Sequence, residues 1–97
     1  MTLTEFSTHV SQLTEHQWKI LEVLIQTHDQ WNSRRQIAKA IGKKRLIPYD
    51  IGCLQALVNM NLIDIQHVHD DTPIGYQVVY RISEGTVSAL MQMEYER

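Results

Sequence analysis

The sequence has a single cysteine, Cys53, among its 97 residues, which excludes a framework of internal disulfide bonds. It has no run of 18 apolar residues, and its N-terminus lacks the basic segment and apolar stretch of a secretory signal. It also has no glycine-rich phosphate-binding loop, and no pattern of a nucleophile with a base and an orienting group. We therefore expect a cytoplasmic protein without a membrane segment, enzymatic activity or cofactor.

Length and composition indicate one small soluble domain over residues 1–97. Hydrophobic residues make up 43% of the chain and charged residues 21%, which is ordinary for a globular protein. A chain of this length buries a modest core, so association with a second copy would add stability.

Positive charge is concentrated in the middle of the chain. Residues 33–63 hold six basic residues against one acidic residue, a net charge of +5, whereas residues 1–32 and 64–97 carry −3 and −4. The six are Arg34, Arg35, Lys39, Lys43, Lys44 and Arg45. Such a patch can meet phosphate even on a protein whose overall charge is −2. The alternative is an ordinary solvated surface.

Residues 33–63 are predicted to form two helices joined by a turn. Ser33 and Gln36 have the spacing of a capping box, and Gly42 suits the left-handed position that ends a helix. Pro48 suits the first position of the second helix, and Asn61 suits its end. Apolar residues repeat at helical spacing inside both segments, at Ile37, Ile41, Ile51, Leu54, Leu57 and Val58.

Two more helices are predicted before this segment. Capping boxes begin at Thr2 and at Thr14, and the second opens a helix from residue 15 to about residue 28. Its main apolar face is predicted to consist of Trp18, Leu21, Leu24 and Ile25. Trp31, in the turn that follows, is expected in the core.

A hairpin and a last helix are predicted after the central segment. Residues 63–68 and 77–82 have the composition of strands, and proline and glycine between them favour a turn. Ser83 is predicted to cap a C-terminal helix over residues 83–97.

The run from Gln36 to Gly42, followed by Leu54, Leu57 and the Asn61-Leu62-Ile63 run, resembles the winged helix-turn-helix superfamily, in particular the MarR-like and PadR-like bacterial regulators. The resemblance covers residues 14–82. It implies an α+β, mostly helical fold with a three-helix core, a β-hairpin wing and extra N- and C-terminal helices. In these families a C-terminal helix is a common dimerisation device; the alternative is that it packs on its own domain.

The resemblance implies binding of double-stranded DNA by a homodimeric transcriptional regulator. The six basic residues would contact phosphates, and Tyr49, Gln55 and Asn59, expected on the exposed face of the second central helix, would read bases. Asp50 is expected on the same exposed face, where it would repel phosphate. In the wing, His69 and Arg81 are the candidates for contact, although Asp70 and Asp71 make its tip acidic. This acidity favours the alternative of a protein–protein interaction module.

Two further features could carry chemistry. His67 and His69 lie on one face of a strand beside acidic residues, which is a weak pattern for a metal site because no third ligand has a fixed spacing. We interpret them as solvated wing residues, with no metal bound. Cys53 follows the apolar stripe of its helix and is expected to be a buried, inert thiol.

Overall fold

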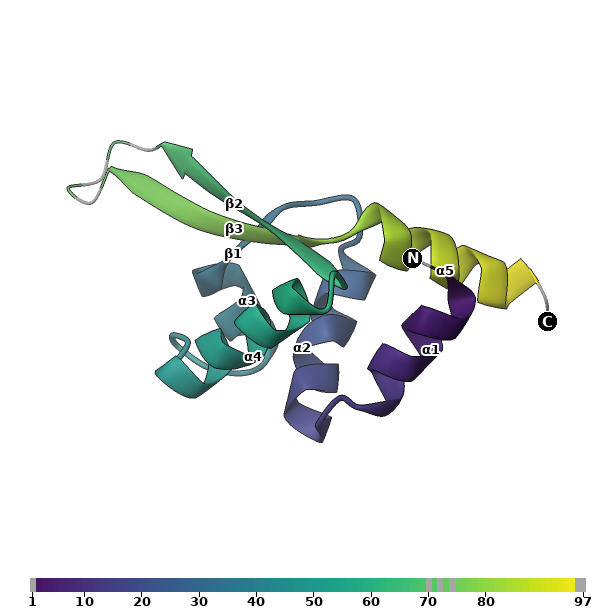
Figure 1. The fold of residues 1–97 in the computed structure, drawn as a ribbon. Coiled ribbons are helices and arrows are strands. Elements are labelled where there is room, and N and C mark those ends of the chain that lie inside the picture. The colour runs from purple at the N-terminus through teal and green to yellow at the C-terminus, as the bar shows by residue number, and fades with distance from the viewer. Residues whose placement is uncertain (1, 70, 72, 74, 96–97) are drawn as a thin grey trace.

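The computed structural model describes residues 2–69, 71, 73 and 75–95. Helices pack together at one end, and a β-hairpin projects from them at the other (Figure 1). The elements, in chain order, are α1 (Leu3–Ser11), α2 (Glu15–Gln26), β1 (Asn32–Ser33), α3 (Arg34–Ala40), α4 (Pro48–Asn59), β2 (Ile63–His69), β3 (Tyr76–Ile82) and α5 (Glu84–Tyr95).

Local signals set the ends of the helices. The Thr2 hydroxyl accepts from the Glu5 N–H, and the capping boxes that begin at Thr14 and Ser33 are both complete. Gly42 and Asn61 have φ angles of 82° and 60°, which confirms the left-handed backbone predicted at these two helix ends. The helix α2 ends at Gln26, slightly before the predicted residue 28.

The helix α2 is the centre of the core, but its buried face differs from the predicted one. Ile20, Leu21 and Leu24 are fully buried, whereas Trp18 is 38% exposed. The prediction that Trp18 lies on the main apolar face was wrong, because α2 contacts α3, α4 and β3 together and its buried stripe turns toward Ile20. In a helix that is covered on several sides, the buried residues are not confined to the one face that apolar spacing in the sequence predicts.

The sheet is antiparallel with strand order β1-β3-β2. Ile65 pairs with Tyr80, so these side chains share one face, and Tyr80 is buried. Farther along the same face, His67 pairs with Val78 and lies beyond the core, where the hairpin extends from the helices as the wing (Figure 1).

Trp31 does not belong to the buried core. It is half-buried at the surface, and the Arg81 guanidinium lies over its ring at 4.3 Å from the centroid. The expected core residue is therefore one half of a cation–π contact at the base of the hairpin.

A buried polar cluster holds α5 to the domain. The Ser83 Oγ accepts from the Thr86 N–H and donates to the Asn61 carbonyl, and the Thr86 hydroxyl donates to the Leu62 carbonyl at 2.7 Å. This confirms Ser83 as the cap of α5. The helix also contacts α1 of its own chain (Figure 1), while Met91 and Met93 stay exposed. No helix in the described part of the chain has the length and hydropathy needed to cross a bilayer.

Thr86→Val should lower the free energy of unfolding by about 1 kcal/mol, because it keeps the shape of the side chain but removes the donor to the buried Leu62 carbonyl. Urea unfolding measures the change. Ser88→Ala, on the exposed side of α5, is the control and should change stability by less than about 0.5 kcal/mol. Equal midpoints for the Thr86 variant and the wild type would show that this hydrogen bond does not secure α5.

Candidate nucleic-acid interface

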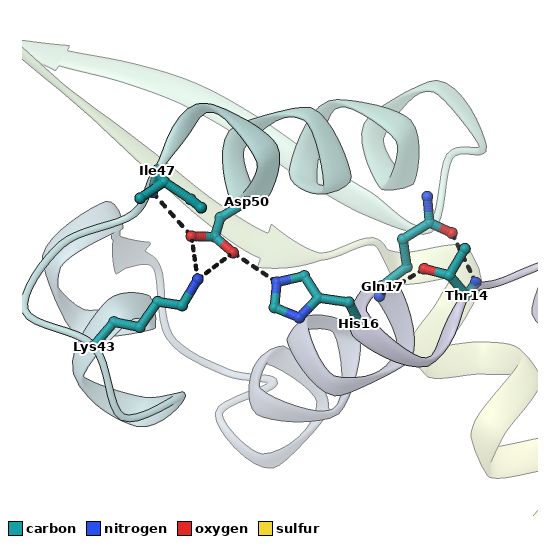
Figure 2. Close-up of polar contacts among 6 residues, drawn as sticks. All are labelled: Thr14, His16, Gln17, Lys43, Ile47 and Asp50. Atoms are coloured by element: carbon teal, nitrogen blue, oxygen red, sulfur yellow. Dashed lines mark hydrogen bonds and ion pairs between the residues drawn. The ribbon is translucent and has the colours of Figure 1, made fainter.

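The helices α3 and α4 form the helix-turn-helix, and a buried carboxylate holds the first turn of α4 in place. Asp50 is 0% exposed. Its carboxylate accepts from the Ile47 N–H at 2.9 Å, from the Lys43 Nζ at 2.9 and 3.0 Å, and from the His16 Nε2 at 2.6 Å (Figure 2). Because an ionised carboxylate can only accept, Nε2 of His16 carries the proton.

The hydrogen bonds decide the charge of Asp50. Burial alone raises the pKa of this carboxyl group, but the hydrogen bonds from Ile47, Lys43 and His16, with the charge of Lys43, outweigh burial and lower the pKa from 3.8 to about 2. Asp50 is therefore ionised at neutral pH, and its charge is balanced inside the protein.

Two expectations for this region need correction. Asp50 is not on the exposed face of α4, because its side chain points between α2 and the turn before α4 (Figure 2), so it cannot meet phosphate. Lys43, expected among the phosphate contacts, pairs with Asp50 and is 34% exposed in its side chain. We therefore leave Lys43 out of the candidate phosphate contacts.

The other predicted basic residues are exposed and lie on α3 or in the turn that follows. They are Arg34, Arg35, Lys39, Lys44 and Arg45. The Nε of Arg34 donates to the hydroxyl of buried Tyr80 at 3.2 Å, which fixes one edge of its guanidinium. Between the start of α3 and the wing lies a hollow of about 320 Å³, lined in part by Arg34, Arg35, His67 and Tyr76. This hollow brings the start of α3 and the strands of the wing together.

The three candidate base-reading residues are exposed on α4. Tyr49 is 60% exposed, and its ring lies 5.3 Å from the His16 ring with an angle of 33° between their planes. The Nε2 of Gln55 donates to the Oδ1 of Asn59 at 3.0 Å. The Gln55 carbonyl oxygen and the Asn59 amide nitrogen take no part in this hydrogen bond and can contact another molecule. The sequence analysis gave no role to His16. The spacing from Ile47 to Asp50 could have indicated the acceptor at the start of α4, but no local pattern identifies His16 as the partner of Asp50.

The wing candidates do not come together. His69 is exposed at the end of β2, where it pairs with Tyr76, whereas Arg81 pairs with Asp64 at the base of the hairpin and stacks on Trp31. Asp71 is exposed, and Asp70 lies outside the described residues.

The histidines and the cysteine of this region show no built chemical site. The His67 ring contacts the Tyr76 ring in a tilted arrangement, with 5.5 Å between the centroids and 51° between the planes. Within residues 2–69, 71, 73 and 75–95, no group of three or more His, Cys, Asp or Glu side chains is placed to hold a metal ion. Cys53 is buried as predicted, and burial raises the pKa of its thiol.

Solved structures with this fold include two bacterial proteins. A PadR family transcription regulator from Clostridium difficile R20291 matches with a TM-score of 0.59 and 16% identity, over 86% of each chain. The MepR protein of S. aureus, solved in a complex with DNA, matches with a TM-score of 0.59 and 17% identity over 94% of this chain. This chain spans 65% of MepR. It has the winged helix-turn-helix fold. No protein-family model and no curated protein matches it by sequence.

Asp50→Asn should lower the free energy of unfolding at pH 5, because a neutral amide cannot balance Lys43. In the wild type the folded-state pKa of about 2 lies below the unfolded value of 3.8, so the stabilisation is complete above about pH 4 and is lost as the pH falls toward 2. The stability gap between wild type and variant should narrow by up to about 2 kcal/mol from pH 5 to pH 2.5 in urea unfolding experiments.

The matched control for this experiment is Glu22→Gln, which removes one acidic charge from the exposed surface of α2. Its stability gap to the wild type should be small at both pH values. A gap for Asp50→Asn that is the same at pH 5 and pH 2.5 would contradict the stabilising role of the ionised carboxylate.

Proposed function

We propose that this protein is a transcriptional regulator that binds double-stranded DNA as a homodimer and has no enzymatic activity. The observation that carries the proposal is the row of five exposed basic side chains on α3 and the turn that leads into α4. The shared fold with a PadR family transcription regulator and with the DNA-bound MepR supports the same role.

The helix α4 would enter the major groove as the recognition helix. It exposes Tyr49, Gln55 and Asn59, and an amide side chain can pair bidentately with adenine. The segment contains no Lys or Arg, so the phosphate contacts would come from α3 and the turn. Phosphate contact and base reading would thus belong to different parts of the motif.

The wing would take part through its two strands more than through the loop at its tip. Arg34 and Arg35 share a hollow with His67 and Tyr76, and a backbone phosphate held there would meet two guanidinium groups. His69 stays a candidate for contact at the end of β2. We leave Arg81 out, because its guanidinium already lies over the Trp31 ring.

The homodimer would form through α5 and the neighbouring end of α2. A hollow of about 330 Å³ lies there, and its apolar lining includes Ile25, Val87, Leu90 and Met91. Met91 is 65% exposed and adjoins this apolar lining, and an exposed apolar patch of this kind favours an interface. A two-fold arrangement would present two copies of α4 to successive turns of the duplex.

The second candidate function is docking of a protein partner. It is favoured by the exposed apolar and aromatic side chains near the turn and on the wing, namely Ile47, Tyr49, Val68 and Tyr76. An apolar interface would respond weakly to salt, whereas phosphate contacts respond steeply. The salt dependence of binding therefore separates the two functions.

Binding of a mixed-sequence duplex should weaken steeply with salt. Five phosphate contacts per protomer, and thus about ten per dimer, predict a slope of log affinity against log salt of about −9 for the dimer, which is a loss on the order of 10⁵-fold between about 50 and about 200 mM salt. Lys44→Ala combined with Arg45→Ala should reduce the steepness of this slope by about 2 per protomer, or about 4 for the dimer. Fluorescence anisotropy of labelled duplex at several salt concentrations measures both quantities.

The matched control for this pair is Gln12→Glu combined with Gln30→Glu, which changes the net charge by the same amount at exposed positions outside the basic segment. The control should keep the wild-type slope within about 0.5. Equal losses in the two double variants would mean that net charge alone governs binding. Absence of duplex binding by the wild type at low salt would reject the DNA-binding function in favour of partner docking.

Light scattering should give twice the chain mass of 11.3 kDa for the wild type. Met91→Glu should shift the molar mass toward the monomer, because a charge would enter the apolar interface. Gln92→Glu adds the same charge at the next position of α5 and should leave the dimer intact. A monomeric wild type, or equal masses for the two variants, would count against dimerisation through α5.

A further inference from the structure

One side chain of α2 contacts two successive residues of the recognition helix. The Nε2 of His16 donates to Asp50 at 2.6 Å, and its ring lies 5.3 Å from the Tyr49 ring (Figure 2 shows the hydrogen bond). The His16 side chain is 25% exposed, so it lies at the edge of the domain, next to the strongly exposed Tyr49. Neither the phosphate contacts nor the proposed dimer uses His16.

We propose that His16 is a positioning residue that sets base specificity: by holding Asp50 and the Tyr49 ring together, it fixes the direction in which Tyr49 meets the DNA. The inference rests on the proposed function, since a direction for Tyr49 matters only if α4 reads bases.

His16 holds the start of α4 against the rest of the domain. The N-cap of α4 is Ile47, which has no polar side chain, so Asp50 supplies the acceptor for the Ile47 N–H. Lys43, the second donor to Asp50, follows the end of α3, and its own N–H donates to the Ala38 carbonyl at 2.8 Å, so it links α4 to α3. His16 belongs to a separate helix, 34 residues earlier in the chain. Among the described residues it makes the one side-chain hydrogen bond between α2 and α4, so it fixes the first turn of α4 against the core.

The His16 ring also restricts the direction of the Tyr49 ring. A tyrosine that is 60% exposed has few contacts to select its rotamer. Apart from a side-chain contact with Cys53 one turn along α4, the described contact of the Tyr49 ring is with the His16 ring. A side chain already held in its bound direction loses less conformational entropy on binding than a free one. The His16 ring therefore makes Tyr49 a selective reader, because a base that does not fit cannot be accommodated by turning the ring.

His16 lies on α2, outside the exposed basic residues of α3 and the turn that follows it. The shallow hollow next to Tyr49 is lined by Thr14, Glu15, His16 and Lys19, in which one acidic and one basic side chain balance. Removal of His16 should therefore leave the number of phosphate contacts unchanged. This separates a loss of base reading from a loss of general affinity.

The experiment first selects preferred duplexes for the wild-type protein from a pool with a randomised central segment. Affinity is then measured for one selected duplex and for an unrelated duplex of the same length, across a salt series. His16→Ala should lower the affinity for the selected duplex by about tenfold, change the affinity for the unrelated duplex by less than about twofold, and keep the salt slope. His9→Ala, a histidine substitution on α1, is the control and should keep both affinities.

Two further variants separate positioning from folding. His16→Gln can still donate to Asp50 but lacks the ring, so it should stay folded by circular dichroism and still lose part of the preference. In a Tyr49→Ala background, His16→Ala should have no further effect on preference, because the ring that it positions is gone.

The other possible outcomes would overturn either this inference or the proposed function. Equal losses for both duplexes, unchanged preference in both His16 variants, or a full effect of His16→Ala without Tyr49 would overturn the inference while leaving DNA binding in place. A wild type that binds duplexes without preference would also overturn it. A wild type that binds no duplex rejects the proposed function, and the inference falls with it.

Discussion

A carboxylate removed from water stays ionised only where hydrogen-bond donors and a counter-charge surround it, and breaking such a set leaves a buried charge without compensation. Asp50 is in this position, and its three partners come from α2, the inter-helix turn and the backbone at the start of α4 (Figure 2). Any displacement of α4 would stretch at least one of these contacts. The direction of α4, and of everything exposed on it, therefore depends on this interaction as well as on the packing of its buried residues Leu54 and Leu57.

Those features that depend on neighbouring residues in the chain could be predicted from the sequence. The capping boxes at Thr14 and Ser33, and the left-handed positions at Gly42 and Asn61, need only two to four consecutive residues to be recognised. The hairpin follows from alternation and turn residues in the same way. These local signals and the three-helix pattern led to the winged-helix fold, which the structure has.

The errors occurred where a partner distant in sequence decides the outcome. Asp50 was expected to be exposed, because an acidic residue in the first turn of a helix is stabilised by the helix dipole without any other partner. Its burial depends on His16, 34 residues earlier, and the same contact set takes Lys43 out of the basic surface. Trp31 likewise has the large aromatic side chain that is typical of a core residue. It nevertheless lies at the surface, where the Arg81 guanidinium of the last strand covers its ring.

The absence of Lys and Arg from α4 has a physical consequence for how the surface divides its roles. A basic side chain on the first turn of α4 would compete with Lys43 for Asp50 or face the exposed α3 cations, so positive charge there would weaken the contact that orients the helix. The exposed cations lie on α3 and the turn that leads into α4. The helix α4 itself exposes neutral groups such as Gln55 and Tyr49. Neutral groups contribute little to nonspecific attraction but can distinguish bases. The buried ion pair and the absence of cations from α4 thus belong to one arrangement. In it, groups outside α4 orient the helix and, in the proposed function, supply the general affinity for DNA.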